Sequence, residues 1–246
     1  MNKMIPAALS ALALALGAGS AHAQVTNGSF NGLAGWTTGG DAASVGNDHL
    51  VLTTSSASVQ DDFDAGLDAG ARNVSGNHPL LTGGGSGSLE AFLGLPGTPL
   101  DDPASGVYTW EGSAASQTFT AAAGSTLAFK WTLSTLDQRD PTQADYAFAV
   151  IDGQVIKLGD AFAASTANAG AGYAAQTGWL AYTATFATGG THTVSFGVVD
   201  VGDSIDTTAL SVTGVSVSAV PESSGLAMLA AGLGLLALQA RRRRAR

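Results

Sequence analysis

The chain has 246 residues, no cysteine, 12% charged residues and a formal net charge of −9. The lack of cysteine excludes a disulfide framework and thiolate metal sites. The span 24–220 holds four basic and 18 acidic residues, a formal charge of −14. We expect no nucleic-acid partner, because such a surface repels phosphate backbones.

The first 23 residues have the three parts of a secretory signal peptide. Lys3 supplies a positive start, and residues 5–16 form an apolar stretch rich in Ala and Leu. Ala21 and Ala23 flank a His in a small-x-small site for signal peptidase. We expect cleavage after Ala23, which leaves Gln24 as the first residue. The alternative is an uncleaved membrane anchor.

Residues 24–219 are expected to form one all-β domain, an antiparallel β-sandwich of jelly-roll type. Phe129–Leu133 and His192–Val198 alternate apolar and polar residues with period two, as half-buried strands do. Asp152-Gly153 reads as a two-residue hairpin turn between two strands. His192 itself, directly after a Gly-Gly turn, is expected to be exposed. The predicted strands are 49–53, 56–60, 116–120, 127–133, 146–151, 154–158, 180–186, 192–199 and 208–218.

The opening of this domain carries a motif, Asn27-Gly28-Ser29-Phe30, with Gly35-Trp36 shortly after it. The motif is similar to the opening of galactose-binding-like jelly rolls and related carbohydrate-binding modules. The resemblance implies a sandwich that binds saccharide, with a structural calcium joining its first and last strands. Asn31 stands where such domains commonly have an acidic residue.

Three carboxylates occur within seven residues, at Asp200, Asp203 and Asp206. Because calcium takes oxygen ligands, many of them carboxylates, this spacing predicts a calcium site. Since Asp is also favoured in turns, the alternative is a polar loop between two strands. The acidic stretch from Asp137 to Asp145 is expected to be a solvated loop.

Four aromatic residues are candidates to stack on sugar rings, and the alternative for each is a place in the core. The candidates are Trp36, Trp110, Trp179 and Tyr182. The chain has no Gly-x-Ser-x-Gly elbow and no His-Glu-x-x-His motif, so we expect no enzyme. A secreted hydrolase is the least favoured function.

Residues 220–246 form a three-part tail. Pro221 and Glu222 come first, and 18 uncharged residues follow, from Ser223 to Ala240. At 1.5 Å per residue these span roughly 27 Å, which predicts a transmembrane helix across a thin hydrocarbon core. Dense arginine after such a helix keeps that end in the cytoplasm. The arginines are Arg241, Arg242, Arg243 and Arg244.

This layout resembles the PEP-CTERM sorting signal, with Ser223 in place of the usual second proline. The resemblance implies recognition by an exosortase, cleavage near Pro221 and only transient anchoring in the inner membrane. It also implies a Gram-negative host that makes exopolysaccharide. The alternative is a permanent C-terminal membrane anchor.

Together these features predict an exported, exosortase-processed protein with a non-enzymatic structural or adhesive role. Its partners would be exopolysaccharide or other components of the extracellular matrix of a biofilm, and its place would be outside the cell or on the cell surface. The alternative function is a calcium-stabilised carbohydrate-binding module.

Overall fold

The structure is a computed structural model, which describes residues 24–55, 73–102, 106–137, 143–170, 172–204, 206–219 and 223–244. The predicted signal peptide with Ala21 and Ala23, the predicted strand 56–60 and the Pro221-Glu222 pair lie outside these residues. The elements are β1 (Thr37–Gly39), β2 (Asp41–Val45), β3 (His49–Thr53), β4 (Leu80–Leu81), α1 (Leu89–Leu93), β5 (Thr109–Ala121), β6 (Thr126–Thr135), β7 (Tyr146–Ile151), β8 (Gln154–Asp160), η1 (Ala161–Ala163), β9 (Thr166–Gly170), β10 (Tyr173–Gln176), β11 (Leu180–Thr185), β12 (Gly190–Val201), β13 (Thr208–Ser218) and α2 (Ser223–Arg244).

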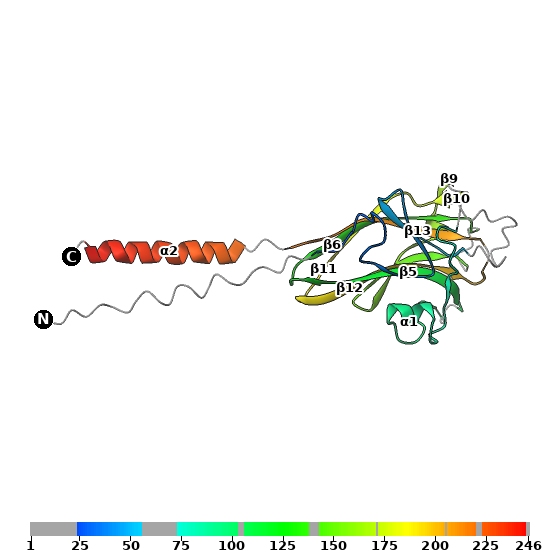
Figure 1. The fold of residues 1–246 in the computed structure, drawn as a ribbon, viewed down its shortest axis with the longest axis horizontal. Helices are drawn as coiled ribbons and strands as arrows, with labels where there is room; N and C mark the ends of the chain where they lie inside the picture. Colours follow the sequence, from blue (N-terminus) through cyan, green and yellow to red (C-terminus); the bar gives the residue numbers. More distant parts are fainter. Residues whose placement is uncertain are drawn as a thin grey trace.

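Two antiparallel sheets pack face to face, which confirms the predicted all-β sandwich (Figure 1). The first sheet has the order β1-β5-β12-β7-β8, and β4 pairs with β5 beside β1. The second has the order β2-β3-β13-β6-β10-β9, and β11 pairs with β6. The long strands β5, β12, β6 and β13 form the centre of the two sheets.

The core between the sheets follows from the period-two alternation in the sequence. Phe129 on β6 and Phe196 on β12 are both buried, and their ring centroids lie 4.8 Å apart in an edge contact across the sandwich. Leu133 and Val198, on the same faces, are fully buried as well. The predicted inward faces of both strands are therefore confirmed.

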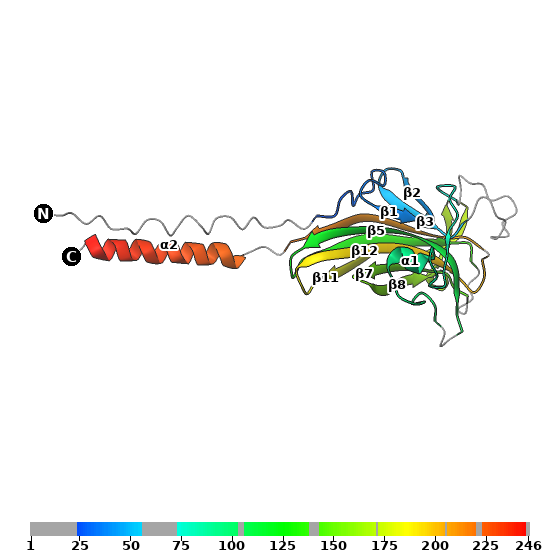
Figure 2. The ribbon, with the colours of Figure 1, turned by 60° about the horizontal axis from the view of Figure 1, so that its bottom comes forward.

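The outer face of the first sheet is also covered, by the segment that runs from β4 to β5. Leu89 and Leu95 of this segment pack with Phe148 and Val199 of the sheet in a second apolar cluster. The short helix α1 lies over this face (Figure 2). Ser88 caps its first turn by accepting a hydrogen bond from the backbone N–H of Ala91. The part of the first sheet beneath this segment is thus buried on both sides.

Helix α2 contains the predicted helical stretch and continues through the four arginines. It lies apart from both sheets (Figures 1 and 2). Five of its leucines are exposed, namely Leu229, Leu233, Leu235, Leu236 and Leu238. Sequence analysis predicted that this helix spans a membrane. In the part of the chain that the structure describes, no helix is both long enough and apolar enough to do so.

Candidate functional site

Trp36, one of the four candidates for sugar stacking, is a core residue. Its side chain is only 7% exposed, and its ring lies 5.0 Å from that of Phe30 and 5.7 Å from that of Phe196. Its Nε1–H donates to the carbonyl oxygen of Asn27 at 3.3 Å. Because its faces are covered by protein, the prediction that Trp36 stacks on a sugar is wrong.

The other three candidates lie in different parts of the sandwich. Tyr182 on β11 is half-buried and stacks on Phe129, with 5.1 Å between the ring centroids. Trp179, directly before β11, is 51% exposed and makes an edge contact with His49 at 6.3 Å. Trp110, at the start of β5, is 54% exposed. Only the two tryptophans therefore offer a largely open ring.

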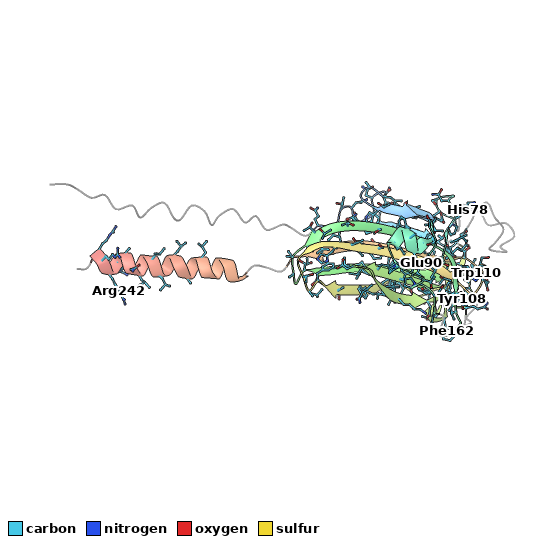
Figure 3. All side chains as sticks on the ribbon, turned by 90° about the horizontal axis from the view of Figure 1, so that it is seen from below. His78, Glu90, Tyr108, Trp110, Phe162 and Arg242 are labelled. Atoms are coloured by element: carbon cyan, nitrogen blue, oxygen red, sulfur yellow. The ribbon has the colours of Figure 1, made fainter. Side chains whose placement is uncertain are left out.

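Trp110 belongs to a group of exposed rings at one end of the sandwich. Tyr108 is 57% exposed and Phe162 is 45% exposed. Figure 3 shows all three at the end of the sandwich away from α2. Tyr108 and Phe162 were not among the candidates predicted from the sequence. The signal for Tyr108 was its spacing of two residues from Trp110, since an extended backbone points such residues to one side.

A pocket of about 520 Å³ adjoins this end of the sandwich. Val107, which lines the pocket, directly precedes Tyr108 in the chain. Its volume falls in the range of about 300–1,000 Å³ that is typical of small-ligand sites. Apolar side chains supply much of its surface, and three charged side chains and one tyrosine supply polar groups. The residues that line it are Pro99, Leu100, Asp101, Asp102, Val107, Ala144, Tyr146, Val155, Lys157 and Val201.

Backbone and side-chain hydrogen bonds hold the acidic wall of the pocket in place. Oδ1 of Asp101 accepts from the N–H of Thr109 at 2.9 Å and from its Oγ1 at 2.8 Å. Asp102 and Val107 exchange two backbone hydrogen bonds, at 2.9 Å and 3.1 Å. Thr109 is the first residue of β5, so Asp101 ties the loop that carries both carboxylates to that strand, and the Asp102–Val107 pair closes the loop.

The opposite wall is built by strands β7 and β8. The Tyr146 hydroxyl donates to the carbonyl oxygen of Leu100 at 2.5 Å, which fastens the covering loop to the sheet. Burial, and then the negative charges of Asp101 and Glu90, raise the pKa of Tyr146 well above its usual value. The hydroxyl therefore stays protonated and keeps donating. The Nζ of Lys157 lies 5.2 Å from the centroid of the Tyr146 ring.

The chemistry of this pocket suits a ligand with hydroxyl groups. The carboxylates of Asp101 and Asp102 can only accept hydrogen bonds at neutral pH, whereas the ammonium of Lys157 can only donate. Lys157 is already paired with Asp160 at 2.7 Å, so one of its three donor positions is taken. The net negative charge disfavours an anionic ligand.

The three aspartates predicted to bind calcium have separate roles. Asp200 is fully buried, and Asp203 accepts a hydrogen bond from the side chain of Gln143 at 3.1 Å. Asp206 has a left-handed backbone, with φ of 69°. Within the described residues, no three His, Cys, Asp or Glu side chains form a group that could hold a metal ion. The calcium prediction therefore rests on the sequence pattern alone.

Asp145, expected in a solvated loop, is instead buried and links three strands. Its Oδ1 accepts from the N–H of Val201 at 2.9 Å, and its Oδ2 accepts from the hydroxyl of Thr208 at 2.5 Å. Burial, and then the charge of Asp137, raise the pKa of Asp145 well above its usual value. That acidic stretch is therefore partly structural, which corrects the sequence-based expectation.

Comparison with known proteins assigns no family to this chain, because no family model and no curated protein matches it. One similar solved structure is TmCBM61 in complex with β-1,4-galactotriose, at 10% identity and a TM-score of 0.36, covering 81% of this chain and 99% of that one. A second is a family 35 carbohydrate binding module from an environmental isolate, at 21% identity and a TM-score of 0.25, covering 45% and 73% of the two chains. A third, the GH31 α-xylosidase of Xanthomonas citri, has 10% identity and a TM-score of 0.17, covering 43% and 12%. At these scores the similarity does not assign a ligand to this chain.

Proposed function

We propose that this chain is an exported, non-catalytic protein that binds saccharide at the end of its sandwich formed by Tyr108, Trp110 and the adjoining pocket. The observation that carries the proposal is the pair of rings, each more than half exposed at the start of a central strand. Large aromatic side chains are normally buried, and where they gather in the open they mark binding surfaces.

Saccharide is the ligand class that this chemistry fits best. A sugar ring has an apolar C–H face, which stacks on an aromatic ring, and a rim of hydroxyls, which hydrogen-bond to charged groups. Trp110 and Tyr108 supply aromatic faces, and the carboxylates of Asp101 and Asp102 supply acceptors. The formal charge of −14 over residues 24–220 disfavours phosphorylated or other anionic ligands.

An array of defined oligosaccharides tests this proposal with the full chain and two single variants. Trp110→Ala should weaken binding by about tenfold or more, as expected for the loss of an exposed aromatic anchor. Trp179→Ala is the matched control, because Trp179 is equally exposed but lies beside the other sheet. Its binding should stay within about twofold of the wild type. Wild-type binding by Trp110→Ala, or a loss with Trp179→Ala alone, would falsify the proposal.

We further propose that the tail directs the protein to the extracellular matrix. The layout of Pro221-Glu222, an apolar stretch and four arginines supports processing by an exosortase, and helix α2 carries those arginines in its last turn. In this view signal peptidase cleaves after Ala23, and the released domain associates with exopolysaccharide. A purely structural or adhesive matrix protein is the alternative, and it would bind no sugar on the array.

Intact-mass analysis of the protein recovered from culture medium tests the processing. The expected species begins at Gln24 and ends near Pro221. A species that keeps Arg246 in the membrane fraction would point to a permanent anchor. Recovery from the cytosol of a chain that retains both Met1 and Arg246 would reject export altogether.

A further inference from the structure

His192, near the start of β12, is buried and paired with a carboxylate. Its side chain is only 5% exposed, and its Nδ1 lies 2.7 Å from Oδ2 of Asp152. The other oxygen of Asp152 accepts from the N–H of Thr193 at 2.9 Å. Because the carboxylate can only accept, Nδ1 donates to it, which leaves Nε2 as the second polar atom of the ring.

Nε2 has no hydrogen-bond partner among the residues that the structure describes. The ring of His192 lies against that of Phe186, with 4.1 Å between centroids, and Phe119 lies 6.3 Å away on another side. Neither aromatic ring can donate a hydrogen bond to Nε2. A buried polar atom without a partner destabilises the protein, and a ligand that supplies the missing partner removes that cost.

His192 lines a groove of about 550 Å³ at the open side of the sandwich. The groove lies between β8, the last strand of the first sheet, and β11, which pairs with β6 in the second sheet. Its lining combines apolar and hydrogen-bonding side chains. The apolar surface comes from Ile156, Tyr182 and Phe186, and the hydrogen-bonding groups come from Gln154, Thr185 and Thr188.

We propose that this groove is a second ligand site. It takes a small uncharged polyol such as one sugar residue, and a hydroxyl of the polyol forms a hydrogen bond with Nε2 of His192. No Lys or Arg lines the groove, and its carboxylate, that of Asp152, is already engaged. A charged ligand would therefore find no counter-charge, whereas a polyol can form hydrogen bonds with the amide of Gln154 and the hydroxyls of Thr185 and Thr188 at the rim of the groove.

Nε2 is covered in this structure, and the ring of Phe186, directly after β11, lies against His192, so entry to Nε2 requires Phe186 to move. Gly189 and Gly190 follow shortly after Phe186 in the chain, and Gly190 has φ of 146°, which side-chain-bearing residues rarely adopt. This pair gives the chain the freedom to open. The groove shares no residue with the pocket beside Tyr108, so the inference stands without the first site.

The test uses the full chain with ¹⁵N-labelled histidine and the methyl glycosides of glucose, galactose and mannose at millimolar concentration. Binding should move the Nε2 resonance of His192, because a new hydrogen bond at this nitrogen changes its shielding. Ala184→Trp fills the groove and should weaken this response by about tenfold. Thr183→Trp is the matched control on the same strand, outside the groove, and should leave it unchanged.

Gln154→Ala gives a second variant that removes a rim group without filling the groove, in case Ala184→Trp does not fold. It should weaken the response several-fold. The inference is overturned if none of the three glycosides moves the His192 resonance, or if Ala184→Trp, once folded, responds like Thr183→Trp. Trp110→Ala should retain the His192 response, so failure here and failure at the first site are separable.

Discussion

Gly28 makes the closest backbone approach in the opening motif, and a methyl group there has no room. A Cβ at this position would lie 1.8 Å from the carbonyl oxygen of Val215 and 2.8 Å from its carbonyl carbon. The carbonyl of Gly28 also accepts from the N–H of Val215 at 2.9 Å. Val215 lies where the pairing register of β13 with β6 shifts, between Thr213 and Ser216. The N-terminal segment therefore docks on an irregularity of β13 through Gly28.

Gly28→Ala should force this segment away from β13. Overpacking against a backbone that cannot yield costs about 1–3 kcal/mol. Loss of the hydrogen bond from Val215 adds about 1 kcal/mol. We expect a total of about 2–4 kcal/mol, with further loss if the buried rings of Phe30 and Trp36 are also displaced. For a domain of this size the unfolding midpoint should fall by roughly 5–15 °C.

Thermal unfolding of the full chain, followed by circular dichroism, measures this shift. Gly85→Ala is the matched control, because a Cβ at Gly85 would meet nothing within 4 Å and its φ is not positive. Its effect should stay within about 0.5 kcal/mol. If Gly28→Ala melts within about 1 °C of the wild type, the docking argument is wrong.

Three further perturbations follow from the buried acids and the predicted ion. Asp145→Asn should raise the unfolding midpoint at pH 7 but not near pH 4. The pKa of Asp145 is raised in the folded protein, so at a pH above the ordinary pKa of aspartate this group lowers the stability of the folded state, and Asn removes that loss. Equal effects at both pH values would contradict this. Asp41→Ala should cost about 2–4 kcal/mol in urea unfolding, since the buried carboxylate accepts from the N–H groups of Ser75 at 2.7 Å and Val74 at 3.0 Å; an unchanged midpoint refutes that role. The calcium prediction requires a chelator to lower the melting midpoint, and an unchanged midpoint rejects a structural ion.

The sandwich was readable from the sequence wherever a strand buries one face and exposes the other. The predicted 127–133 falls within β6, and 49–53, 146–151 and 208–218 match β3, β7 and β13. Helix α1 was missed, because five residues are too few to show helical periodicity. The outer face of the first sheet is covered by this helix and its flanking loops, and that burial depends on tertiary contacts rather than on a local pattern.

The candidate site was predicted only in part, because exposure of an aromatic ring is a tertiary property. Trp36 and Trp110 are both followed by small or polar residues, yet one is buried and the other open. His192 was expected to be exposed, but it has the same parity as Val194 and Phe196, which were correctly placed inward. The period-two alternation therefore indicates that His192 is buried. The expectation that it is exposed was based on the preceding Gly-Gly turn instead.

Strand β13 runs from one end of the sandwich to the end where the C-terminal tail begins. The strand begins at Thr208, at the end of the sandwich where β12 pairs with the start of β5, and it leaves at Ser218 beside Thr126. Eleven residues at about 3.3 Å each separate these ends by roughly 35 Å. Tyr108 and Trp110 lie at the first of these ends and the C-terminal tail leaves from the second, so the length of the sandwich separates those rings from any partner that holds the tail.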